Sequence, residues 1–113
     1  DATIYVENIS GPILLLTGSE DIVWPSTFMS NQIIKRLGQY KFPFMYKHIH
    51  YKGAGHLLNE IVKMGGSFTD NRKARLDAKE QIKTFINLTT SYLKMVRLCP
   101  QQHVPQEKRQ ESL

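Results

Sequence analysis

The chain contains one unbroken apolar run, Ile13 to Leu16, followed directly by Thr-Gly-Ser-Glu-Asp. A continuous apolar run of this length predicts a strand buried on both faces of a parallel sheet, because a half-solvated strand would alternate apolar and polar residues. Gly18 permits a sharp turn after the strand and places Glu20 and Asp21 in the following loop. Since open α/β sheets bind ligands at the carboxyl ends of their strands, this position is typical of a functional site.

A helix and a second strand are predicted after this loop. Apolar residues recur at helical spacing from Ser26 to the Gly38 region, and the β-favouring stretch Tyr46 to Tyr51 follows. Strand, helix and strand form a βαβ unit, whose two strands are parallel. The sequence therefore predicts an α/β fold with flanking helices.

A histidine occupies the matching position after the second predicted strand, where the turn Gly53-Ala54-Gly55 presents His56. We expect Asp21 and His56 to meet, because the carboxyl ends of parallel strands lie at one edge of a sheet. A carboxylate that accepts the Nδ1 proton of a histidine leaves Nε2 to act as general base toward a nucleophile. The order of acid and histidine is that of α/β-hydrolases. No Gly-x-Ser-x-Gly elbow is present, so the nucleophile is expected upstream of Asp1 or is absent.

A long amphipathic helix is predicted from about Asp70 into the Tyr92 to Val96 region, with Thr69 or Asp70 as its N-cap. The residues expected to form its buried stripe are Ala78, Ile82, Phe85, Ile86, Thr89 and Leu93. The basic residues Arg72, Arg75, Lys79 and Lys83 lie on another side of this helix. We interpret them as a solvated face, and phosphate binding is the alternative hypothesis.

Composition excludes several classes of function. The net charge of +5 is spread along the chain without a dense basic block, so a nucleic-acid partner is not expected. No apolar run approaches the roughly twenty residues of a membrane span. A single cysteine, Cys99, excludes an intrachain disulfide framework, and its place after His56 is wrong for a hydrolase nucleophile. The polar tail over residues 99–113 is expected to be disordered, which leaves residues 1–98 as the folded part.

Four further residues have ordinary structural interpretations. Glu20 is interpreted as a solvated loop carboxylate, and Trp24 as a packing residue under the loop. His48 and His50 have a spacing that can bind metal, but without a third ligand they are interpreted as strand histidines. We therefore expect no metal and no resident cofactor.

Two segments resemble the carboxyl-terminal part of the acyl-CoA thioester hydrolase and bile acid-CoA:amino acid N-acyltransferase family. They are Gly11 to Ser26, which contains Trp-Pro-Ser, and Tyr51 to Leu58, which contains Gly-Ala-Gly-His. The resemblance extends over Ile9 to Leu93. It implies a fold similar to dienelactone hydrolases, of which this chain supplies the carboxyl-terminal portion of the α/β-hydrolase sheet, incomplete on its own.

The family uses a Ser or Cys nucleophile with Asp and His on acyl-CoA thioesters. The resemblance thus implies that Asp21 is the triad acid, that His56 is the triad base, and that Trp24 and Ser26 shape the acid's loop. It further implies that this chain is part of an acyl-CoA thioesterase and is inactive without its nucleophile. The alternatives are an acyl-CoA:amino acid N-acyltransferase and a truncated, non-catalytic paralogue that acts as an interaction module.

The resemblance also implies partners and a location. The substrate is an acyl-CoA, and the open sheet edge pairs with the amino-terminal remainder of the hydrolase domain or with a partner chain. A cytoplasmic location is expected, with the peroxisome as the alternative, because Glu111-Ser112-Leu113 lacks the small-basic-Leu pattern of a peroxisomal signal. The sequence Asn59-Glu60-Ile61 departs from the longer acidic and proline-containing loop of the family, so the resemblance does not extend to the acyl-chain specificity of the usual members.

Overall fold

The computed structural model of the protein describes residues 2–58, 61–62 and 64–98. Along the chain lie β1 (Ile13–Gly18), α1 (Ser26–Gln39), β2 (Tyr46–Tyr51) and α2 (Phe68–Leu98), with 3₁₀ turns at Val6–Asn8 and His56–Leu58. The predicted tail and Cys99 lie outside the described residues.

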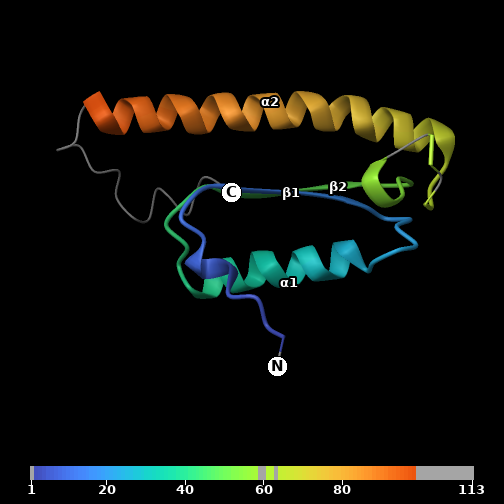
Figure 1. Cartoon of the computed structure of the whole chain (residues 1–113), viewed down its shortest axis with the longest axis horizontal. Helices are drawn as coiled ribbons and strands as arrows, with labels where there is room; N and C mark the ends of the chain where they lie inside the picture. The colour runs from blue at the N-terminus through green and yellow to red at the C-terminus, as the bar shows by residue number, and fades with distance from the viewer. Residues whose placement is uncertain (1, 59–60, 63, 99–113) are drawn as a thin grey trace.

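The two strands form a parallel sheet between two helices. β1 pairs with β2 from Ile13 opposite Tyr46 to Gly18 opposite Tyr51. Helix α1 lies along one face of the sheet and α2 along the other (Figure 1). The prediction of an α/β fold with a parallel βαβ unit is therefore confirmed, and the second strand has the expected bounds.

The main hydrophobic core lies on the α1 face of the sheet. Leu37 and Phe42 are fully buried there, and they pack with Val6 and Tyr46. The rings of Phe42 and Tyr46 meet edge to face at 6.0 Å, a favoured aromatic geometry. An ion pair between Glu7 and Arg36 joins the segment before β1 to α1. This face of the sheet is therefore covered by α1, and the segment before β1 is held against α1.

The N-terminus of α2 differs from the prediction, because Ser67 provides the cap instead of Thr69 or Asp70. The Ser67 Oγ accepts a hydrogen bond from the Asp70 backbone N–H at 3.0 Å. It also donates one to the Asp70 carboxylate at 2.6 Å. This reciprocal arrangement satisfies a helix N–H that would otherwise lack a partner, so the helix begins at Phe68.

The predicted buried stripe of α2 is wrong beyond its first turns. Ala78 is buried, Phe85 and Thr89 are half-buried, and Ile82, Ile86 and Leu93 are exposed. The reason is length: the 31-residue helix is about 46 Å long, whereas the six-residue strands span about 20 Å. Figure 1 shows α2 extending past the start of the strands.

β1 is also less buried than expected. Ile13 to Leu16 are half-buried, although the sequence predicted burial on both faces. β2 covers one edge of β1 within the described residues, and a hollow lies between part of β1 and α2. None of the described helices has the length and hydrophobicity required to cross a membrane.

Candidate active site

The loops that follow β1 and β2 bring a carboxylate and an imidazole together. The Asp21 Oδ2 lies 3.0 Å from the His56 Nδ1, which is hydrogen-bonding distance. The Asp21 side chain is 5% exposed and the His56 side chain 23% exposed. The parallel register places both loops at one end of the sheet, so the contact follows from the topology.

The other oxygen of Asp21 is held by its own loop. The Asp21 Oδ1 accepts hydrogen bonds from the backbone N–H groups of Val23 at 2.9 Å and Trp24 at 3.0 Å. Burial alone would raise the pKa of Asp21, but the hydrogen bonds from His56, Trp24 and Val23 outweigh it and hold the pKa well below its usual range. The site therefore contains an ionised carboxylate whose orientation is fixed.

Ser26 lies beside this carboxylate. Its hydroxyl favours the charged form of Asp21 and so contributes to the lowered pKa. The Ser26 Oγ is buried and has no partner within hydrogen-bond geometry among the described residues, so its effect is that of a nearby dipole. That Ser26 shapes the acid's loop stays a prediction.

The turn that carries His56 forms backbone hydrogen bonds with two neighbouring loops. The Ala54 carbonyl accepts a hydrogen bond from the Glu20 N–H at 2.8 Å, and the His56 N–H donates to the Met64 carbonyl at 2.9 Å. A Cβ on Gly18 would collide with the Ala54 carbonyl, so only glycine permits this approach. The position of His56 is thus set by backbone contacts on both sides.

Asn71, near the start of α2, completes this support. The residue is 1% exposed, and its side chain accepts a hydrogen bond from the Gly55 N–H at 2.7 Å and donates one to the Gly65 carbonyl at 3.1 Å. A buried amide that joins two turns locks both of them. Asn71 was not among the predicted site residues, because no spacing pattern in the sequence marks it.

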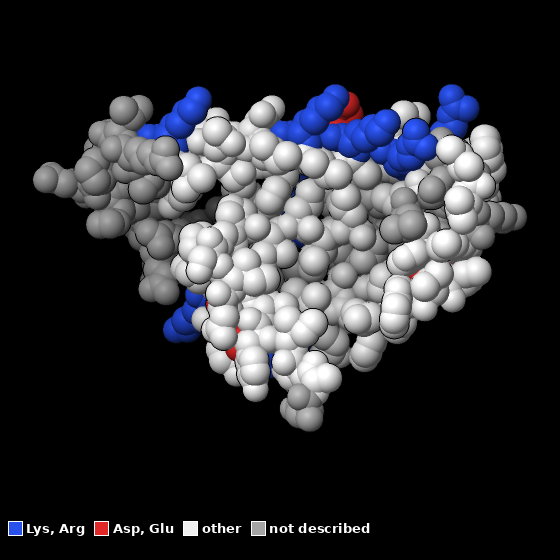
Figure 2. Space-filling view, viewed as in Figure 1, with Lys and Arg blue, Asp and Glu red and all other residues white. Residues whose placement is uncertain are grey.

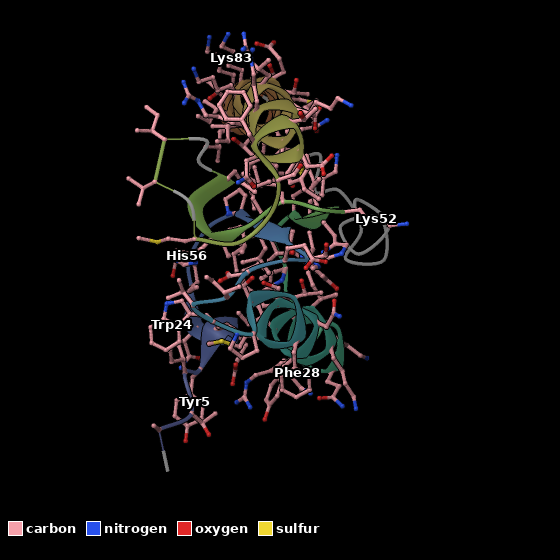
Figure 3. The ribbon with its side chains drawn as sticks, turned by 90° about the vertical axis from the view of Figure 1, so that its right-hand side faces the viewer. Tyr5, Trp24, Phe28, Lys52, His56 and Lys83 are labelled. Atoms are coloured by element: carbon pink, nitrogen blue, oxygen red, sulfur yellow. The ribbon has the colours of Figure 1, made fainter. Side chains whose placement is uncertain are left out.

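A hollow of about 400 Å³ adjoins the pair. Its wall includes Asp21, Ser26 and His56 from the loop side, Leu16 from β1, and Arg75, Ala78, Lys79 and Ile82 from α2. Figure 3 looks toward the carboxyl ends of the strands, with His56 and Trp24 on the same side and Lys52 on the other. The hollow combines apolar walls, an acid–base pair and two cations.

The other candidates of the sequence analysis lie around this centre. Trp24 is 58% exposed, so its interpretation as a packing residue is wrong; its contribution to the site is its backbone N–H. Glu20 is exposed, in agreement with a solvated carboxylate. Among the described residues no group of three metal-ligating side chains exists, and His48 and His50 share hydrogen bonds with Thr17.

The parallel sheet with its two helices is the carboxyl-terminal portion of an α/β-hydrolase fold. A family model described as BAAT / Acyl-CoA thioester hydrolase C terminal matches residues 1–60, more than half of the chain. The chain belongs to this family. The matched range contains both strands, Asp21 and His56, and it ends before α2. Comparison with curated proteins and with solved structures gives no match.

Proposed function

We propose that this chain is the carboxyl-terminal part of an acyl-CoA thioesterase and supplies the acid and the base of its catalytic triad. The observation that carries the proposal is the 3.0 Å contact between the Asp21 Oδ2 and the His56 Nδ1 at the carboxyl ends of two parallel strands. A serine or cysteine from the segment that precedes this chain supplies the nucleophile.

The chemistry follows from the tautomer that Asp21 selects. The His56 Nδ1–H donates a hydrogen bond to the Asp21 carboxylate, which leaves Nε2 unprotonated. The His56 Nε2 therefore accepts the proton of the nucleophile while the nucleophile attacks the thioester carbonyl. His56 then returns this proton to the departing sulfur of coenzyme A. In the second half-reaction His56 takes a proton from water, which attacks the acyl-enzyme, and His56 then returns this proton to the nucleophile as the free acid is released. The Asp21 carboxylate stays ionised throughout, because its hydrogen bonds keep its pKa low.

The test is acyl-CoA hydrolysis by the full-length protein that contains this chain, measured as release of the coenzyme A thiol. His56→Ala and Asp21→Asn should each lower kcat by about three to four orders of magnitude, as in other triads that lose one member. Assays with and without glycine separate hydrolysis from transfer to an amine.

The chain offers a matched control for the acid. Glu20→Gln removes a neighbouring carboxylate that is exposed to solvent, and it should leave turnover close to the wild-type value. Near-normal turnover of Asp21→Asn or His56→Ala would refute the assignment. A wild-type protein with no thioester turnover, and with no nucleophile elbow in its full sequence, would instead support the non-catalytic paralogue.

A further inference from the structure

The segment that leads into α2 runs along the turn that carries His56. The His56 N–H donates to the Met64 carbonyl at 2.9 Å, and the Ser67 N–H donates to the Gly53 carbonyl at 3.3 Å. Between these two hydrogen bonds the segments form an antiparallel bridge. The backbone before α2 therefore packs along the whole turn of the base.

Asn71, in the first turn of α2, is bonded to both of these segments. Its Oδ1 accepts a hydrogen bond from the Gly55 N–H at 2.7 Å, and its Nδ2 donates one to the Gly65 carbonyl at 3.1 Å. Figure 2 shows lysine and arginine side chains along the outer side of α2, whereas Asn71 is 1% exposed and faces the turns. The amide thus connects α2 with the residue directly before His56.

The segment that Asn71 holds also lies against the loop of the acid. A Cβ on Gly65 would collide with the Glu20 carbonyl oxygen, so the Gly65 backbone packs directly on the residue before Asp21. One side chain of α2 is therefore bonded to the turn of the base and to the segment that touches the loop of the acid. Asn71 is not among the residues that line the hollow, so its effect on a reactant must pass through these turns.

We propose that Asn71 is a positioning residue for His56: its amide fixes the Gly55 peptide and thereby holds the His56 Nδ1 against the Asp21 carboxylate. The 3.0 Å contact between Nδ1 and Oδ2 joins two separate loops, so it depends on the spacing of those loops. A displacement of about 1 Å can cost about a hundred-fold in rate. This inference rests on the proposed function, since it assigns Asn71 to the base of that site. It also gives a role to α2, which lies beyond the matched residues 1–60.

Asn71→Leu in the full-length protein tests this role, because it removes the amide and keeps the approximate size of the side chain. The kcat for acyl-CoA hydrolysis should fall about ten-fold to a hundred-fold. KM should stay near the wild-type value, because Asn71 does not line the hollow. In the His56→Ala background the same substitution should have no further effect on kcat, since a residue that acts through His56 has no effect without it. A wild-type kcat for Asn71→Leu, or an equal loss in both backgrounds, would overturn the proposal.

Two further variants separate positioning from a loss of stability. Asn71→Asp keeps a side-chain oxygen for the Gly55 N–H, so its kcat should exceed that of Asn71→Leu. Leu37→Val leaves a cavity in the core on the α1 side of the sheet, so it should lower the urea midpoint and leave kcat near wild-type. Equal kcat values for the two Asn71 variants, or a loss of kcat in Leu37→Val as large as that in Asn71→Leu, would contradict positioning through Gly55.

A spectroscopic signature keeps the test independent of turnover. In protein with nitrogen-labelled histidine, the hydrogen-bonded Nδ1–H of His56 should give a downfield proton signal, which is identified by its loss in His56→Ala. This signal should disappear or move upfield in Asn71→Leu and persist in Leu37→Val. Absence of thioester turnover by wild-type would refute the proposed function, and the signal would then decide the role of Asn71. An unchanged signal in Asn71→Leu would refute that role.

Discussion

At the scale of single residues, Thr17 joins two histidines on the sheet face that packs against α1. Its Oγ1 lies 2.8 Å from the His48 Nε2 and 3.2 Å from the His50 Nδ1. The Thr27 Oγ1 of α1 also lies 3.2 Å from the His50 Nδ1. A hydroxyl has one proton, so the neutral pair is satisfied when His48 donates through Nε2 and His50 accepts at Nδ1. Burial, and then the charge of His50, lower the pKa of His48.

This lowered pKa predicts a loss of stability in acid. Because the pKa of His48 is lower in the folded chain than the 6.5 of an unperturbed histidine, the unfolded chain binds the proton more readily. The contribution of neutral His48 to the free energy of unfolding is fully present above about pH 6.5. It is lost as the pH falls through the folded-state pKa. His48→Gln keeps an N–H donor for Thr17 but cannot titrate.

Urea unfolding of the full-length protein at several pH values between about 5 and 7.5 measures this effect. The free energy of unfolding should fall less toward pH 5 in His48→Gln than in wild-type. Parallel profiles of the two proteins would contradict the prediction.

At the scale of elements, the turns that follow β1 and β2 position the acid–base pair, and Gly18 is a point of close approach between them. A Cβ on Gly18 would meet backbone atoms of Ala54, and would lie 2.8 Å from the Gly55 carbonyl oxygen. Because these are backbone atoms of the turn that carries His56, the turn must shift if Gly18 gains a side chain.

Gly18→Ala should therefore lower the free energy of unfolding by about 1–3 kcal/mol and also reduce thioester turnover. Gly11→Ala is the matched control, since nothing lies within 4 Å of a Cβ at that position. Urea unfolding and kcat are measured for both variants in the full-length protein. A Gly18→Ala protein with wild-type stability and turnover would show that the turn adapts without moving His56.

Local sequence patterns predicted the elements, but not the contacts that depend on distant residues. The apolar run at Ile13 to Leu16 and the alternating stretch at Tyr46 to Tyr51 define strands locally, and parallel pairing then implies the contact of Asp21 with His56. Asn71 escaped prediction because its partners, Gly55 and Gly65, belong to turns that only the fold brings near. The exposure of α2 depends on the length of the sheet beneath it, which helical periodicity does not encode.

At the scale of the whole molecule, the buried hydrophobic cluster lies on one face of the sheet, between the strands and α1. The α1 face has a closed core around Leu37 and Phe42. On the α2 side Ile82, Ile86 and Leu93 are 40%, 55% and 52% exposed, and β1 has one paired edge within the described residues. Exposed apolar side chains and an unpaired strand edge each favour association with other protein surface. This agrees with the proposal that a preceding part of the hydrolase covers this side.

The proposal predicts opposite effects of one substitution in two contexts. In the 113-residue chain alone, Ile86→Lys removes exposed apolar surface, so self-association in analytical ultracentrifugation should decrease. In the full-length protein the same lysine would be buried against the covering segment, and the free energy of unfolding should fall by about 1–3 kcal/mol.

Leu88→Lys is the control, because Leu88 is 53% exposed and lies two residues further along α2, on the opposite side of the helix. It should change the stability of the full-length protein by no more than about 0.5 kcal/mol. Equal and small effects of both substitutions in the full-length protein would show that this side of α2 stays in solvent there, and the covering segment would then have to pair with the edge of β1 alone.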